Sequence, residues 1–315
     1  MSVVFVFPGQ GSQYVGMGRA MAEAFPAARR TLAEADEALG RSLTSLLFEG
    51  PDDELRLTWN TQPAILAVSV ACLRALEEET GIRPAMAAGH SLGEYSALVA
   101  SGALGFGDAL RVVEQRGRFM QEAVPLGTGS MAAILGLEAD RVRSICVEVT
   151  RDGAVVEMAN DNSPGQAVIS GHVAAVEEAS RRMKEAGAKR AVPLPVSAPF
   201  HCSLMAPAGE RLAAVLEGVA VSAPRFPVVA NVDALPHGDP AQVRSRLVQQ
   251  VSRPVRWQDC VRALAAAGAS RFVEVGPNKV LAGLMRRIVP EAGVAGVEDP
   301  KGLEAARALA GGGAA

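Results

Sequence analysis

The chain has 315 residues, of which 49% are hydrophobic, and it carries a net charge of −3 from 31 basic and 34 acidic residues. A chain of this length can bury a substantial core and is long enough for an enzyme of about two domains. The near balance of charge and the lack of a basic tract remove the electrostatic footprint of nucleic-acid binding, so we expect no nucleic-acid partner.

The first apolar stretch is short. Residues 2–7 have no basic lead-in, and the run breaks at Pro8, far below the length of a signal core or a membrane span. We therefore expect a soluble, cytoplasmic protein without a membrane partner. The four cysteines are Cys72, Cys146, Cys202 and Cys260. They lie far apart, without C-x-x-C spacing, which predicts reduced, mostly buried thiols and no metal site.

The first third of the chain alternates short β-rich runs with helical patterns. The pattern predicts strands at 3–7 and 86–89, and helices at 15–39, 62–79 and 92–101. Such alternation is typical of a mainly parallel α/β sheet.

From about residue 129 the pattern changes. The expected elements are a strand at 130–136, a helix at 138–150, strands at 155–159 and 166–170, a helix at 173–186 and a strand at 189–194. This βαββαβ order is the signature of a ferredoxin-like fold. Its completeness within a short stretch predicts an inserted small subdomain at 127–197.

The remaining chain resumes the α/β alternation. Strands expected at 227–231 and 272–275 would return to the first sheet. Residues 1–126 and 198–315 are therefore predicted to form one large subdomain around the insert.

The segment Gly89-His90-Ser91-Leu92-Gly93 has the G-x-S-x-G form and lies between an expected strand and an expected helix. That context is what a nucleophile elbow requires, because the tight turn leaves no room for side chains at the two glycines. It would hold Ser91 exposed at a helix N-terminus, where amides and the helix dipole stabilise a developing oxyanion. The alternative is a structural serine that caps the helix.

A base for Ser91 must come from four histidines. His90 is adjacent on a sharp turn and is expected to point away. His237 lies in a Pro-Gly loop that is expected to be at the surface. His172 begins a helix, where it could cap, and His201 follows the small subdomain. Spacing along the chain does not decide between His172 and His201 as the base, and no acid obviously completes a triad.

One arginine falls on the apolar face of the helix expected near 108–122. That face is formed by Ala109, Val112, Val113, Met120 and Ala123. Arg116 shares it, so its guanidinium is expected to point inward, where it requires a partner. The partner is either a structural carboxylate, such as Glu94, or the carboxylate of a substrate, which a guanidinium can clamp through two hydrogen bonds.

Taken together in their order, six motifs identify a resemblance over nearly the whole chain. They are Phe7-Pro8-Gly9-Gln10-Gly11-Ser12-Gln13, Gly89-His90-Ser91-Leu92-Gly93-Glu94-Tyr95, Gln115-Arg116-Gly117 with Met120-Gln121, Asn160-Asp161-Asn162-Ser163-Pro164-Gly165-Gln166, Ser197-Ala198-Pro199-Phe200-His201 and Glu274-Val275-Gly276-Pro277. The chain resembles the malonyl-CoA:acyl carrier protein transacylases of type II fatty acid synthesis. That resemblance implies an α/β hydrolase-like large subdomain with a ferredoxin-like insert.

The resemblance also implies the catalytic roles. It makes Ser91 the nucleophile and His201 the base, with the backbone carbonyl of Gln250 orienting the histidine in place of an acid. It gives the oxyanion contacts to the backbone amides of Gln10 and Leu92.

Further roles concern the substrates, malonyl-CoA and acyl carrier protein. By the resemblance Arg116 becomes the clamp for the malonyl carboxylate. A phenylalanine just before the base, here Phe200, goes with choice of malonyl in related acyltransferases. The amide-rich segment with Asn160, Asn162 and Gln166 is expected to be a loop that binds the pantetheine arm, and no metal or prosthetic group is needed.

Three other functions remain open. A stand-alone acyltransferase of a polyketide synthase would share every residue named. A serine esterase would use the same elbow, but an inward Arg116 would have no carboxylate to pair. A non-enzymatic binding module would leave the combination of Ser91, His201 and Gln10 without a purpose.

Overall fold

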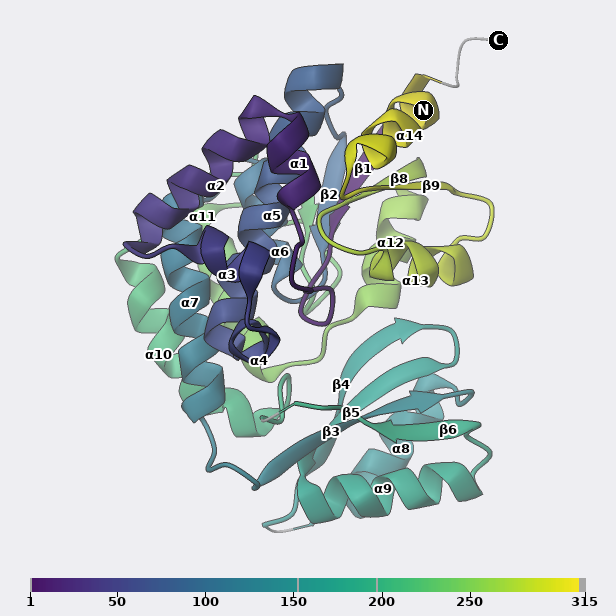
Figure 1. Ribbon diagram of the computed structural model, residues 1–315. Helices are drawn as coiled ribbons and strands as arrows, with labels where there is room; N and C mark the ends of the chain where they lie inside the picture. Colours follow the sequence, from purple (N-terminus) through teal and green to yellow (C-terminus); the bar gives the residue numbers. More distant parts are fainter. Residues whose placement is uncertain (1, 152, 197, 312–315) are drawn as a thin grey trace.

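The computed structural model describes residues 2–151, 153–196 and 198–311 and has a large and a small part (Figure 1). The large part is built on a five-stranded parallel sheet, and the small part on a four-stranded antiparallel sheet. The predicted α/β class, with a second sheet formed by an inserted segment, is therefore confirmed.

The parallel sheet has the order β7-β2-β1-β8-β9. Its strands are β1 (Ser2–Phe7), β2 (Met86–Gly89), β7 (Val228–Val229), β8 (Ala269–Val275) and β9 (Gly293–Val297). The two late strands expected near 227–231 and 272–275 do return to this sheet, whereas β9 was not expected.

Both faces of the sheet are covered, as a parallel sheet requires. Side chains alternate along β1, so that Phe5 and Phe7 enter the core on one face while Val4 and Val6 enter the core on the other. The helices before and after the insert are α1 (Arg19–Ala24), α2 (Pro26–Leu39), α3 (Leu43–Glu49), α4 (Asp52–Arg56), α5 (Thr58–Thr80), α6 (Gly93–Ala100), α7 (Phe106–Glu122), α10 (Ala206–Glu217), α11 (Pro240–Ser252), α12 (Trp257–Ala266), α13 (Val280–Ile288) and α14 (Pro300–Gly311), with a 3₁₀ turn, η1 (Ser203–Met205).

One predicted helix is divided. The stretch expected as a single helix at 15–39 contains α1 and α2, which meet at Phe25 and Pro26. Proline cannot donate to the preceding turn, but it fits the first position of a new helix.

The small part follows the predicted βαββαβ order. Its elements are β3 (Gly129–Leu135), α8 (Ala139–Val149), β4 (Val156–Ser163), β5 (Gln166–His172), α9 (Val173–Glu185) and β6 (Arg190–Pro193). The strand order β4-β5-β3-β6 encloses a hydrophobic core of its own against α8 and α9. Residue 197, where the predicted insert ends, lies outside the described residues, so the boundaries stay a prediction.

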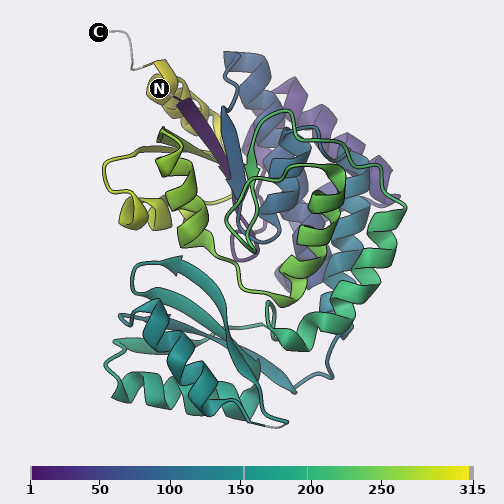
Figure 2. The ribbon, with the colours of Figure 1, turned by 180° about the vertical axis from the view of Figure 1, so that it is seen from behind.

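Strand β4 also joins the two parts, which lie one above the other in Figure 2. The backbone N–H of Val255 donates to Ala159 O at 2.9 Å, and Asp161 N–H donates to Val255 O at 3.0 Å. These bonds fix the end of β4 against the large part.

The carboxyl ends of β1 and β2 lie side by side, with Phe7 opposite Gly89. The turn after β2 then packs directly against backbone. A Cβ added to Gly89 would lie 1.9 Å from Gly93 C, and one added to Gly93 would lie 2.0 Å from Phe7 O. Only glycine fits at both positions, as the elbow hypothesis requires.

Candidate active site

Ser91 and His201 lie within hydrogen-bonding distance of each other. Ser91 lies in the turn between β2 and α6, and its Oγ is 2.8 Å from Nε2 of His201. Both residues are buried, and both have positive φ angles, of 50° and 58°. Such angles strain a residue that has a Cβ, and strain of this kind concentrates at functional sites.

The other ring nitrogen of His201 determines the tautomer. Nδ1 lies 2.8 Å from the backbone oxygen of Gln250. A carbonyl only accepts, so Nδ1 carries the proton and Nε2 is free to accept the hydroxyl hydrogen of Ser91. Burial, and then the positive charge of Arg116, lower the pKa of His201 to about 3, which keeps the ring neutral near pH 7.

The amides of Gln10 and Leu92 border the same turn. Gly9 approaches the elbow so closely that a Cβ on it would lie 2.3 Å from His90 O, and Leu92 stands at the N-terminus of α6. Within the described residues neither amide donates to a protein acceptor. Both amides are therefore available to a ligand beside Ser91.

Arg116 on α7 is 1% exposed, as the helical pattern predicts. Its Nη1 donates to Gln62 Oε1 at 2.7 Å, and its Nη2 donates to Gln250 Oε1 at 2.9 Å and to Ser91 Oγ at 3.2 Å. Among the described residues no carboxylate pairs with it, so the ion pair considered with Glu94 is not formed. The charge lies beside Ser91 with only neutral partners.

Two residues that contact Ser91 or Arg116, namely Asn231 and Gln62, were not anticipated from the sequence. Asn231 Oδ1 accepts from the backbone N–H of Ser91 at 2.7 Å, and its Nδ2 donates to Gly89 O at 2.8 Å. Asn231 follows β7 at the sheet edge where β2 ends, and it is the last residue of the strand predicted at 227–231, so a polar side chain at the carboxyl end of a predicted strand was a usable signal. Gln62 offered only the signal of a polar side chain on a helix that is otherwise largely apolar.

His90 and His172 are used elsewhere. His90 packs on Trp257, with ring centroids 5.7 Å apart, and its Nε2 lies 2.8 Å from Asn162 Oδ1. His172 occupies the N-cap position of α9 without a side-chain cap, and its Nδ1 accepts from Val155 N–H. Within the described residues, neither side chain is hydrogen-bonded to Ser91.

The prediction that His237 lies at the surface is wrong. Its side chain is fully buried, and its Nε2 lies 2.9 Å from Glu94 Oε1. The loop folds back on β7, where the backbone N–H of His237 donates to Val228 O. Proline and glycine indicated a turn correctly, but they carry no information on what covers it.

The expected amide-rich loop is also corrected, because Asn160 and Asn162 belong to β4, and Gln166 begins β5. Pairing with β5 extends the strand up to the turn at Pro164. Gln166 Oε1 accepts from Arg287 at 3.0 Å, whereas the side-chain amide of the buried Asn160 makes no hydrogen bond within the described residues.

Phe200 lies next to the base and is 7% exposed, packed into the main core. The four cysteines are free and buried. Over the described residues no helix is long and apolar enough to cross a membrane, and no three acidic, histidine or cysteine side chains are grouped to hold a metal ion.

Comparison with known proteins gives consistent results. The family model for the acyl transferase domain matches residues 4–303. The malonyl CoA-acyl carrier protein transacylase of Salmonella typhimurium is 52% identical over 302 residues, 96% of this chain and 97% of the relative. The acyl-carrier-protein S-malonyltransferase of Burkholderia pseudomallei superposes with a TM-score of 0.96 at 51% identity, covering 98% and 100% of the two chains. A malonyl-transacylase solved in complex with a type II polyketide acyl-carrier protein has a TM-score of 0.95 at 49% identity, covering 97% and 99%.

Proposed function

The chain belongs to the acyl transferase family and, within it, to the malonyl CoA-acyl carrier protein transacylases, and on this premise we propose that it transfers malonyl from malonyl-CoA to the phosphopantetheine thiol of acyl carrier protein in fatty acid biosynthesis. The observation that carries the proposal is the buried guanidinium of Arg116, 3.2 Å from Ser91 Oγ and without a carboxylate partner among the described residues. A nucleophile beside an uncommitted cation suits an acyl group that itself bears a carboxylate.

In the first half-reaction Ser91 Oγ attacks the thioester carbonyl while His201 Nε2 takes its proton. The carbonyl oxygen becomes an oxyanion, for which the amides of Gln10 and Leu92 are the proposed donors. The carbon–sulfur bond then breaks, and the CoA sulfur leaves with the proton from His201. The carbonyl of Gln250 keeps the imidazole in one tautomer throughout, which is the task that an acid performs in a triad.

The second half-reaction repeats these steps in reverse. The thiol of the carrier protein gives its proton to His201 and attacks the malonyl ester, and Ser91 Oγ leaves and recovers the proton. The same dyad serves both halves, so no metal or prosthetic group is required.

Arg116 acts twice in this scheme. It binds the malonyl carboxylate, and that carboxylate offsets the positive charge that helps to lower the pKa of His201. Binding of the correct acyl group therefore makes His201 a stronger base. An acetyl group offers no such compensation, and an ordinary ester substrate of an esterase offers none either.

For the pantetheine arm we propose the amides of Asn160, Asn162 and Gln166. The unbonded side-chain amide of Asn160 supports this most directly, because Asn162 and Gln166 already contact His90 and Arg287. We also propose that the reaction takes place in the cytoplasm, and the four free, buried thiols support this.

A type II polyketide carrier protein is the second candidate acceptor, because one close relative was solved with such a carrier. The dyad and the arginine would serve either carrier equally. The two are separated by comparing kcat/KM for a fatty acid carrier and a polyketide carrier under the same conditions.

The proposed function is tested by two-substrate kinetics with malonyl-CoA and holo acyl carrier protein. Wild-type enzyme should give the parallel lines of a double displacement, and Ser91→Ala should lose transfer while it keeps its circular dichroism spectrum and melting temperature. Transfer by Ser91→Ala, or hydrolysis of malonyl-CoA without transfer in the wild type, would refute the proposal.

The lowered pKa of His201 predicts an unusual pH dependence. A histidine works as a base only when neutral, and this one stays neutral well below the ordinary pKa of 6.5. The rate of enzyme acylation, measured as kcat/KM between pH 4.5 and 8, should therefore stay level through pH 6.5 and fall only in more acidic solution. Activity measured after samples are returned to pH 7 controls for unfolding. A reversible loss of half the acylation rate near pH 6.5 would contradict the geometry of the buried His201.

Acyl selection should divide between Arg116 and Phe200. Arg116→Ala should depress malonyl transfer and raise relative acetyl transfer, because the unpaired charge is gone. Phe200→Ser should raise the rate of methylmalonyl transfer relative to malonyl transfer by roughly 10-fold or more, as expected for one methyl group in a tight pocket. It should not restore acetyl transfer. Competition among malonyl-, methylmalonyl- and acetyl-CoA measures both; an unchanged malonyl preference in Arg116→Ala would make the arginine purely structural.

A further inference from the structure

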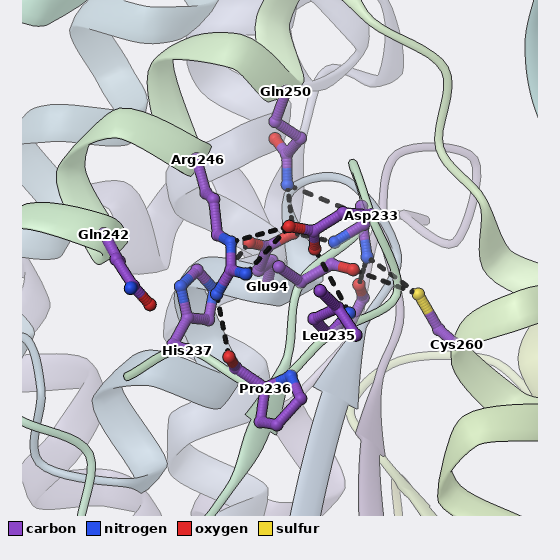
Figure 3. Close-up of polar contacts among 12 residues, drawn as sticks. Glu94, Asp233, Leu235, Pro236, His237, Gln242, Arg246, Gln250 and Cys260 are labelled. Atoms are coloured by element: carbon purple, nitrogen blue, oxygen red, sulfur yellow. Dashed lines mark hydrogen bonds and ion pairs between the residues drawn. The ribbon is translucent and has the colours of Figure 1, made fainter. Parts of the chain in front are cut away.

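A buried carboxylate, that of Glu94, lies three residues after Ser91 in the sequence and takes no part in the proposed half-reactions. Glu94 on α6 is fully buried, and its oxygens accept three hydrogen bonds (Figure 3). The donors are His237 Nε2 at 2.9 Å, Asn231 backbone N–H at 2.9 Å and Gln250 Nε2 at 2.7 Å. Asn231 N–H and Gln250 Nε2 can only donate, and His237 Nε2 donates in the tautomer that carries its proton there.

Gln250 links this carboxylate to the catalytic groups. Its backbone oxygen holds His201, its side-chain Oε1 accepts from Arg116, and its Nε2 donates to Glu94 and, at 3.1 Å, to Ser91 O. A carboxylate cannot donate, so Glu94 requires the nitrogen end of the amide to face it. The oxygen end is thereby left for Arg116.

His237 keeps Glu94 in place from the opposite side, and its loop is tied to the same helix that bears Gln250. Arg246 Nη1 donates to Pro236 O at 2.8 Å, and α11 carries both Arg246 and Gln250, one turn apart (Figure 3). The loop, the carboxylate and the amide therefore form one connected unit.

We propose that Glu94 and His237 are positioning residues that fix the orientation of the Gln250 amide and, through it, hold Arg116 in place for the acyl carboxylate. Glu94 also supplies a negative charge one amide away from the guanidinium without occupying its donors. A carboxylate paired directly with Arg116 would compete with the carboxylate of the acyl group.

The inference rests on the proposed malonyl transfer and predicts a change in selectivity. In Glu94→Leu no acceptor remains at position 94 for Gln250 Nε2, so the Gln250 amide loses the partner that holds its nitrogen end and the acceptor of Arg116 is no longer fixed. The kcat/KM ratio of malonyl-CoA over acetyl-CoA should fall about 10-fold or more, which is the effect of one hydrogen bond to a charged group. Loss of structure alone lowers both rates together and leaves the ratio unchanged.

Glu114→Leu is the matched control, because Glu114 lies on α7, as Arg116 does, but pairs with Arg41 at the partly buried periphery. It should keep the wild-type ratio. His237→Leu removes a donor to Glu94 and should lower the ratio several-fold, whereas His237→Gln retains a donor and should restore most of it. This second pair decides the matter if Glu94→Leu does not fold.

The outcomes separate the two hypotheses. If wild-type enzyme forms no malonyl-enzyme, the proposed function fails. If the wild type is active and both Glu94→Leu and His237→Leu, normalised to active sites, keep its ratio, Glu94 and His237 are structural and this inference is overturned.

Discussion

The chemistry of this protein depends on how closely the turn after β2 approaches the end of β1. Gly89 and Gly93 allow backbone to touch backbone there, since a Cβ at either position would lie about 2 Å from a main-chain atom of the neighbouring segment. This contact places Ser91 at the carboxyl edge of a parallel sheet and at the start of α6. The loop after β1, with Gln10, is brought to the same edge because Phe7 and Gly89 are paired.

Around that turn, amides and carbonyls take positions often held by acids. The backbone oxygen of Gln250 orients His201, and the side chains of Gln62 and Gln250 hold Arg116. Neutral partners fix these groups without cancelling the charge of the guanidinium or protonating the imidazole. The site is thus neutral at the base and positive at the clamp, as an acyl group with a free carboxylate requires.

Features that follow from local pattern could be predicted from the sequence. The bounds of β2 agree with the prediction, and the inward position of Arg116 follows from helical spacing. Features that depend on distant partners could not be predicted. Asn231 reaches Ser91 across 140 positions, and His237 is buried because its loop folds onto a strand that precedes it.

Prediction from the local sequence pattern also fails where residues that are typical of turns pair with a neighbouring strand. The stretch around Asn160 has the composition of a loop, yet pairing with β5 makes most of it strand. The resemblance compensated for much of this, because it assigned roles to Gln250 and Gln10 that no local pattern carries. It did not reveal the side-chain contacts of Gln250, which only the packed structure brings together.

We propose that Ser91 carries the malonyl group between two thiols and that His201, oriented by a carbonyl, is its base. The direct test is to quench enzyme mixed with malonyl-CoA before the carrier protein is added, followed by intact-mass analysis and peptide mapping. We expect one malonyl group per chain, on Ser91, which disappears when the carrier thiol is supplied. Malonyl found on another residue, or a malonyl-Ser91 that the carrier does not discharge, would contradict it.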